Sequence, residues 1–143
     1  MSAEYQLILY TDGAARGNPG QAAIGYAIFD SAGNSVEKDA KGIGVHTNNE
    51  AEYEALLWGI EKVRERSCGN LRVVSDSELM VKQIRGEYKV KEDRLRIYAE
   101  RVAVNKRLFN SFEVVHVRRE DARIALVDAL VNSVLEKMGY PKK

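Results

Sequence analysis

The sequence predicts an α/β protein: a five-stranded mixed sheet, made of an antiparallel meander of three strands plus two parallel strands, with helices on both faces. Two observations support this prediction. The first third of the chain contains three strand-like runs joined by short connections, which is the pattern of an antiparallel meander. The remainder alternates helical patterns with two short apolar strands, which places helices against the faces of a sheet.

The three strands of the meander are expected at residues 5–11, 22–30 and 36–45. The first is an apolar-rich run, and a turn at residues 31–34 follows the second. Between these two strands we expect residues 12–20 to form a loop, because the segment contains three glycines, an asparagine and a proline.

The first helix begins at a clear N-terminal signal. Thr47-Asn48-Asn49-Glu50 has the Thr-x-x-Glu form of a capping box, and apolar residues follow at helical spacing. The helix is expected to end near residues 67–70. The later elements are expected to be a strand at 71–75, a short helix at 77–85, a charged helix at 91–109, a strand at 112–117 and a final helix at 123–138.

The composition is that of an ordinary globular chain, which we expect to be a single domain over residues 1–143. The net charge is only +1, so any binding of nucleic acid must rely on a local basic patch. No apolar run is long enough to span a bilayer, and the start of the chain lacks the features of a signal peptide. The lone cysteine, Cys68, is expected to be at least partly buried and indicates a reducing compartment. We therefore expect a cytoplasmic protein.

Four acidic residues occupy positions where acids are costly. Asp12 and Asp76 each directly follow an apolar strand, and strand ends in one α/β sheet can lie side by side. Glu52 and Asp128 each share a helix face with apolar residues, so both are expected to point toward the sheet. A buried carboxylate needs a partner or a metal, and no Lys or Arg stands at the matching places. Converging carboxylates would suit Mg²⁺ or Mn²⁺.

Each of these acids also has a purely structural explanation. Asp12 with the following glycine is, taken alone, most simply a turn. Asp76 alone is equally well explained as a helix cap. Glu52 and Asp128 could reach solvent from the edges of their apolar faces. Four acids in such positions would occur together by chance much less often than any one of them alone.

Three motifs resemble those of type 1 ribonuclease H, in the same order and at similar spacing. They are Thr11-Asp12-Gly13-Ala14-Ala15-Arg16-Gly17-Asn18-Pro19-Gly20, then Thr47-Asn48-Asn49-Glu50-Ala51-Glu52, then Ser75-Asp76-Ser77. Residues 83–91 are similar to a segment of those family members that lack the long basic protrusion. The resemblance implies the ribonuclease H-like fold from end to end.

The resemblance also implies an activity: an endonuclease that hydrolyses the RNA strand of RNA/DNA hybrids by a two-metal-ion mechanism, leaving 5′-phosphate and 3′-hydroxyl ends. Asp12, Glu52, Asp76 and Asp128 would be the catalytic residues and would hold two ions of Mg²⁺ or Mn²⁺. The expected partner is the RNA/DNA hybrid. We expect no membrane association and no obligate protein partner, and a monomer is the default.

Contacts with the hybrid follow from the same motifs. The resemblance assigns contacts with 2′-hydroxyl groups to Asn48, Asn49 and the Gly17–Asn18 turn, since amides can both donate to and accept from a hydroxyl. Asn18 and Thr47 resemble the family's pocket for a phosphate of the DNA strand. For the two asparagines of the helix start, capping is the alternative.

Basic residues after the short helix could add phosphate contacts. They are Lys89, Lys91, Arg94 and Arg96. A solvated helix face explains this group equally well.

The C-terminal motif departs from the family pattern. Members usually have the last acid six residues after an Arg-Glu pair, with an asparagine between, whereas here Asp128 follows Glu120 by eight residues and the asparagine is absent. Asp128 is still the expected fourth acid, because the helix around it matches, and Asp121 is the alternative. No histidine stands between Glu120 and Asp128, so Arg118 or Arg119 is expected to be the cation that assists phosphate binding or product release. His116 is a further alternative, although its place late in a strand favours a structural role.

Two other classes of function remain open at the level of sequence. One is a related fold that cuts DNA, such as a transposase core, against which the Thr-Asn-Asn segment argues. The other is a catalytically weakened hybrid-binding module with the same fold, which the altered C-terminal motif keeps open.

Overall fold

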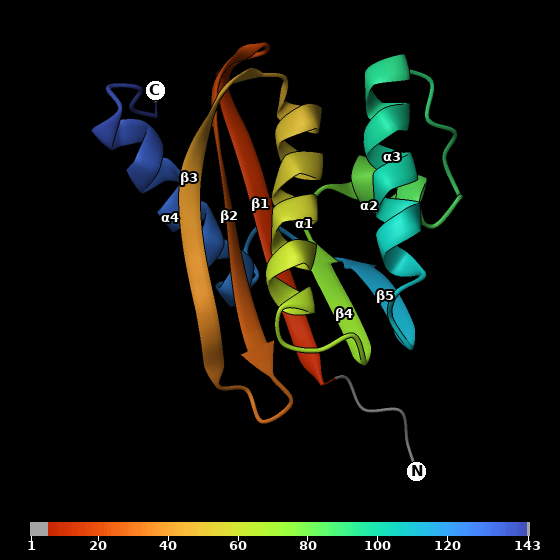
Figure 1. Cartoon of the computed structure of the whole chain (residues 1–143). Coiled ribbons are helices and arrows are strands. Elements are labelled where there is room, and N and C mark those ends of the chain that lie inside the picture. Colours follow the sequence, from red (N-terminus) through yellow and green to blue (C-terminus); the bar gives the residue numbers. More distant parts are fainter. Residues whose placement is uncertain (1–5, 143) are drawn as a thin grey trace.

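The computed structural model describes residues 6–142 and contains a five-stranded sheet with the strand order β3-β2-β1-β4-β5 (Figure 1). β1 (Leu7–Gly17), β2 (Gly20–Asp30) and β3 (Ser35–His46) form an antiparallel meander. β4 (Asn70–Ser75) and β5 (Ser111–His116) extend the sheet beyond β1 in parallel. The predicted mixed sheet is confirmed, and of the first expected strand only Tyr5 lies outside the described residues.

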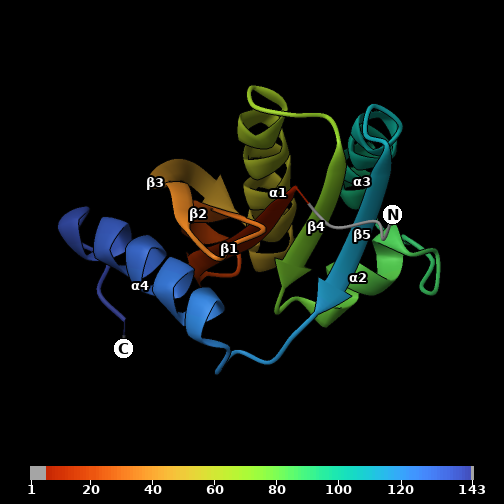
Figure 2. The same ribbon diagram turned by 90° about the horizontal axis from the view of Figure 1, so that it is seen from below.

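Helices cover both faces of this sheet, as predicted. α1 (Asn48–Arg64) and α3 (Asp93–Lys106) lie on one face, and α4 (Ala122–Lys137) lies on the other (Figure 2). The short α2 (Glu78–Ile84) follows the end of β4. The four helices begin and end within a few residues of their expected limits, and α1, α2 and α3 are each shorter than expected.

The expected loop at residues 12–20 is wrong. β1 continues without interruption to Gly17, and its ladder with β2 closes at the pair Gly17 and Gly20. Small side chains make this possible, because Ala14 and Ala15 pair with alanines of β2 and remain partly covered. Asp12 therefore lies within a long hairpin strand rather than at the end of a short one.

The capping box at the start of α1 is present in full. Thr47 Oγ1 accepts a hydrogen bond from the Glu50 backbone N–H at 3.1 Å, and Glu50 Oε1 accepts one from the Thr47 N–H at 2.8 Å. Two otherwise unpaired N–H groups at the helix start are thereby satisfied. The cap fixes where α1 begins relative to the sheet.

Alternate side chains of β1 enter two different apolar layers. Leu9 packs toward α1 among buried residues such as Leu56 and Ile60. Tyr10 packs on the opposite face, against Ile124 and other residues of α4. Because successive strand residues point to opposite faces, the even-numbered residues after Tyr10 also face α4.

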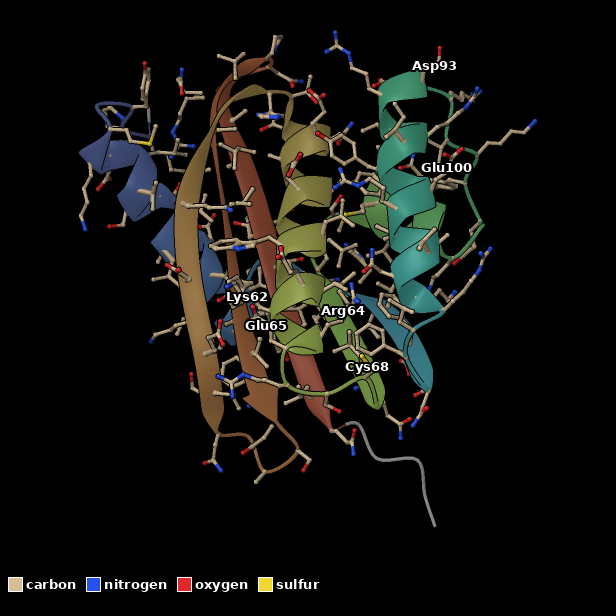
Figure 3. The ribbon with its side chains drawn as sticks, viewed as in Figure 1. Lys62, Arg64, Glu65, Cys68, Asp93 and Glu100 are labelled. Carbon is tan, nitrogen blue, oxygen red and sulfur yellow. The ribbon has the colours of Figure 1, made fainter. Side chains whose placement is uncertain are left out.

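Two expectations about the rest of the molecule have clear outcomes. No helix within residues 6–142 has the length and the apolar character that crossing a bilayer requires. Cys68, which we expected to be partly buried, is exposed instead; it lies in the connection between α1 and β4, where no element covers it (Figure 3).

Candidate metal centre

Three carboxylates from three separate elements converge next to β1. Asp12, Glu52 and Asp76 each offer an oxygen, and these oxygens all lie within 4.8 Å of one another. They come from β1, from α1 and from the residue that follows β4. Such an all-oxygen set of donors is what hard divalent cations prefer.

Gly13 brings Glu52 next to Asp12. Its backbone N–H donates to Glu52 Oε1 at 3.0 Å. A Cβ atom at Gly13 would lie only 2.4 Å from the carbonyl oxygen of Ala51, so α1 can pack this closely on β1 only because residue 13 has no side chain. The glycine in this Asp-Gly pair therefore serves helix packing, not a turn.

Asp76 is placed by the parallel pairing of β4 with β1. Tyr10 lies opposite Val74 in that ladder, so the chain two residues further on in each strand brings Asp12 and Asp76 to the same edge. The side chain that caps α2 is that of Ser77, whose Oγ accepts from the Met80 N–H at 3.3 Å. The capping role considered for Asp76 is thus taken by its neighbour.

Asp128 approaches Asp12 from the other face of the sheet. It lies in the second turn of α4, and its hydrogen bond and negative charge act on Asp12. Its Oδ2 accepts from Asn132 Nδ2 at 3.1 Å. Asp121, the alternative fourth acid, is the N-cap of α4 and accepts from the Arg123 and Ile124 N–H groups. The structure thus brings Asp128, and not Asp121, to the acidic cluster.

The electrostatics of the cluster favour a bound cation. Burial, with the charges of Asp76 and Asp128, raises the pKa of Asp12 from 3.8 to about 8. Burial, with the charges of Asp12 and Asp76, raises the pKa of Glu52 well above its ordinary value. Burial also raises the pKa of Asp76. Each carboxylate makes its neighbours harder to ionise, and a divalent cation would relieve that repulsion.

Two basic side chains act on this cluster: Arg119, in the loop before α4, and His116, at the end of β5, whose charge also lowers the pKa of Asp76. The charge of Arg119 lowers the pKa of Asp76 and of Glu52, against the effect of burial. Arg119 and its neighbour Arg118 are both exposed, so neither neutralises the acids from within the site. A cation at the rim can meet a negatively charged ligand that approaches from solvent.

The tip of the β1–β2 hairpin is tied to the start of α1. Asn18 Oδ1 accepts from the Asn48 backbone N–H at 3.0 Å, and Asn48 Oδ1 accepts from the Ala15 N–H at 2.9 Å. Gly17, at φ +100°, makes the turn that places Asn18 there. Asn18 and Asn48 are both exposed, so the segments predicted to contact substrate form one continuous rim.

A groove of about 470 Å³ leads from this rim toward the basic segment after α2. Its lining includes Asn49, Leu79, Gln83, Tyr88, Lys89 and Lys91. The two lysines are exposed, and neither forms an ion pair with another residue in the described part of the chain. The basic residues Arg94 and Arg96 instead lie near Glu50 and Asp93. Lys89 and Lys91 are the free cations of this groove.

Residues 10–134 match a family model described as reverse transcriptase-like. Among curated proteins, the chain is 36% identical over 129 residues to Ribonuclease HI of Halobacterium salinarum, which covers 89% of this chain and 63% of that protein. It is 32% identical over 133 residues to the Bifunctional protein Rv2228c of Mycobacterium tuberculosis, which covers 92% of this chain and 36% of that protein. The chain therefore spans less than two thirds of the length of these two relatives.

Solved structures resemble the fold over almost its whole length. The crystal structure of RNase H1 from Halobacterium salinarum superposes with a TM-score of 0.87 at 33% identity and covers 92% of this chain and 98% of that one. LC11-RNase H1, solved in complex with an RNA/DNA hybrid, superposes with a TM-score of 0.86 at 40% identity and the same two coverages. The N-terminal RNase H domain of Rv2228c gives a TM-score of 0.84 at 29% identity.

Proposed function

Because the chain belongs to the reverse transcriptase-like family and to the type 1 ribonuclease H family, we propose that it is an endonuclease that hydrolyses the RNA strand of RNA/DNA hybrids. Its products would carry 5′-phosphate and 3′-hydroxyl ends. The observation that carries this proposal is the convergence of Asp12, Glu52 and Asp76, whose ligand oxygens lie within 4.8 Å of one another. The RNA/DNA hybrid bound by the related LC11-RNase H1 supports the choice of substrate.

Asp12, Glu52, Asp76 and Asp128 are the residues that would hold two divalent ions, Mg²⁺ or Mn²⁺. The donors fit such ions, because all are carboxylate oxygens and because burial and mutual repulsion, which raise the pKa values of Asp12, Glu52 and Asp76, would both be offset by a bound cation. When bound, the ions would activate the attacking water and offset the charge on the leaving 3′ oxygen. The protein's own contribution is to hold the four acids from both faces of the sheet, so that the scissile phosphate meets a preformed site.

Arg119 is the cation we assign to the phosphate or to product release, with Arg118 beside it as the second candidate. Arg119 is close enough to Asp76 and Glu52 to lower their pKa values, and it is exposed. A guanidinium can bind two phosphate oxygens at once. It would therefore hold the reacting or the departing phosphate without entering the acidic cluster.

The hairpin tip and the start of α1 supply donors for the RNA strand. The backbone contacts of Asn48 use its Oδ1, which leaves its Nδ2 free to donate to a 2′-hydroxyl. Asn49 and Gly17 would make further contacts of this kind. Thr47 Oγ1 accepts within the capping box but keeps its own proton, so Thr47 and Asn18 can still donate to a phosphate of the DNA strand.

Lys89 and Lys91 would bind phosphates along the groove that begins at Asn49. Glu87 and Glu92 also line this groove, so the two lysines would act as individual cations within a lining of mixed charge. We propose that residues 1–143 form one catalytic domain that acts as a monomer. The lone cysteine, Cys68, supports a reducing compartment such as the cytoplasm.

Cleavage of an end-labelled RNA strand in an RNA/DNA hybrid tests the proposal directly. The parent chain should cut the hybrid with Mg²⁺ or Mn²⁺ and should be inactive in EDTA, and Asp12→Asn should abolish cutting. Asp128→Ala should also abolish it, since Asp128 completes the acidic cluster. Tight binding of the hybrid by the parent without cleavage under either metal would replace the proposal with the catalytically weakened binding module. Preferential cutting of duplex DNA would point to the related DNA-cutting enzymes.

A further inference from the structure

A side chain, and not the backbone, holds the carboxylate of Asp128. Asn132 lies one helical turn further along α4 and donates from Nδ2 to Asp128 Oδ2 at 3.1 Å. Glu52, by contrast, accepts from the backbone N–H of Gly13. Residues four apart on a helix lie on the same face, so Asn132 is well placed to fix Asp128 but must itself be kept in orientation.

Arg16 determines which end of the Asn132 amide faces Asp128. Arg16 Nη2 donates to Asn132 Oδ1 at 2.7 Å. A guanidinium has only donors, so the amide oxygen must face Arg16 and the NH₂ group must face Asp128. In the opposite orientation, the NH₂ group would oppose the guanidinium and the oxygen would oppose the carboxylate. Both contacts would be repulsive.

Arg16 is anchored in turn. It lies four residues after Asp12 in β1 and therefore on the same face of that strand, toward α4. Its Nε donates to the carbonyl oxygen of Tyr140 at 3.2 Å, and its side chain is half-buried. A chain of contacts thus runs from β1 through Arg16 and Asn132 to Asp128, which is back beside Asp12.

We propose that Asn132 is a positioning residue of the metal centre and that Arg16 acts through it. Together they would fix the Asp128 carboxylate in the orientation in which it completes the site. This inference rests on the proposed function, in which Asp128 holds a metal ion. Groups that hydrogen-bond to metal ligands without touching the metal commonly change metal affinity or activity by about 10- to 100-fold when they are removed.

Binding of Mn²⁺ to the whole chain, followed by isothermal titration calorimetry without nucleic acid, tests this inference. Asn132→Leu keeps nearly the same volume and removes both polar ends, so it should weaken Mn²⁺ binding by about tenfold or more. Arg16→Met should weaken binding in the same direction but less, because Asn132 remains and only its orientation is freed. In an Asp128→Ala background, Asn132→Leu should cause no further loss.

Asn105→Leu is the matched control. Asn105 lies on α3, accepts from Arg64 Nη1 at 3.1 Å and donates to the carbonyl oxygen of Arg101 at 2.8 Å, so its bonding resembles that of Asn132 at a place remote from the acids. Its substitution should leave Mn²⁺ binding unchanged. Equal binding by Asn132→Leu and the parent, or equal loss in Asn105→Leu, would overturn the inference.

The inference and the proposed function fail in distinguishable ways. A parent chain that binds Mn²⁺ but does not cut hybrid refutes the function, and the Mn²⁺ titrations still decide the role of Asn132. A parent that cuts hybrid while Asn132→Leu and Arg16→Met bind Mn²⁺ normally refutes the positioning role alone. If Asn132→Leu does not fold, Arg16→Met carries the same test from the other end of the contact.

Discussion

Asp12 lies directly opposite Gly25 in the β1–β2 ladder, and the absent side chain of Gly25 lets α4 approach the sheet at that point. A Cβ atom at Gly25 would lie 2.9 Å from Val131 Cγ2 and 3.2 Å from Val127 Cγ1. Val127 immediately precedes Asp128. The depth at which α4 packs on β2 therefore sets the position of Asp128 relative to Asp12.

Gly25→Ala should push α4 outward and withdraw Asp128 from the cluster. We expect cleavage of hybrid to fall by at least tenfold and the free energy of unfolding to fall by about 1–3 kcal/mol, as in other overpacked cores. Adding Val131→Ala should recover part of both losses, because it vacates the space that the new methyl group needs. Urea unfolding and a cleavage assay measure the two effects, and full activity in Gly25→Ala would contradict this account of α4.

Gly13→Ala should be more damaging, because the new Cβ would meet backbone that has no rotamer to change. It would lie 2.4 Å from the oxygen and 2.5 Å from the carbon of the Ala51 carbonyl. We expect loss of cleavage and a clear fall in melting temperature. Gly42→Ala is the control: its Cβ would meet the flexible end of Met138 at 2.9 Å, which can move aside. Equal tolerance of the two substitutions would refute the role given to Gly13.

The acidic cluster makes the stability of the metal-free protein depend on pH. The pKa of Asp12 is about 8 in the folded chain against an ordinary value of 3.8, so between these values the folded state holds more protons than the unfolded state. The free energy of unfolding should therefore fall as pH rises from about 4 to about 8. Asp12→Asn should remove part of this fall and stabilise the metal-free protein at pH 9 by about 1–3 kcal/mol.

Thermal unfolding in EDTA at pH 5 and pH 9 measures this effect. Added Mn²⁺ should reverse the order at pH 9, since it binds the folded parent and stabilises it by mass action, whereas Asp12→Asn should gain much less. The change in melting temperature between pH 5 and pH 9 in EDTA is compared between the parent and Asp12→Asn. If the two changes are equal, the pKa of Asp12 is not raised.

Lys89 and Lys91 should contribute to affinity through phosphates alone. In the Lys89→Ala/Lys91→Ala double variant, the slope of log K against log salt concentration should fall by roughly one unit for each phosphate contact that is lost. The turnover rate at saturating hybrid should change little. Lys62→Ala/Arg64→Ala removes the same charge near the far end of α1 and should leave the slope unchanged (Figure 3). An unchanged slope in Lys89→Ala/Lys91→Ala would show that the two lysines do not contact phosphates of the hybrid.

Much of the fold could be predicted from the sequence, because short sequence patterns mark the same helix and strand limits that the packed structure has. The capping box at Thr47 marks the true start of α1, and the order of strands and helices is as expected. The segment after Asp12 was predicted wrongly because glycine, asparagine and proline usually mark loops. Here Gly13 faces Ala51 of α1, and the turn itself contains only Asn18 and Pro19, between the closing pair Gly17 and Gly20. Local composition does not reveal what a glycine packs against.

The acidic residues of the site could be predicted from the sequence, but the residues that hold them in position could not. Asp12, Glu52 and Asp76 attract attention because charge is costly on apolar elements, and the structure brings these three together. Arg16 and Asn132 are ordinary residues in their own elements, and their hydrogen bond joins positions 116 apart. No periodicity records such a pairing. It becomes visible only when β1 and α4 are seen in contact.

Asp12 lies between helices on the two faces of the sheet, so the acidic cluster is assembled only as these helices pack during folding. Glu52 reaches the cluster from the α1 side of the sheet and Asp128 from the α4 side, and α4 is the last helix along the chain. A nascent polypeptide that has folded its meander and α1 still lacks Asp128. The proposed metal centre would therefore be complete only after α4 has been synthesised and has packed on the sheet.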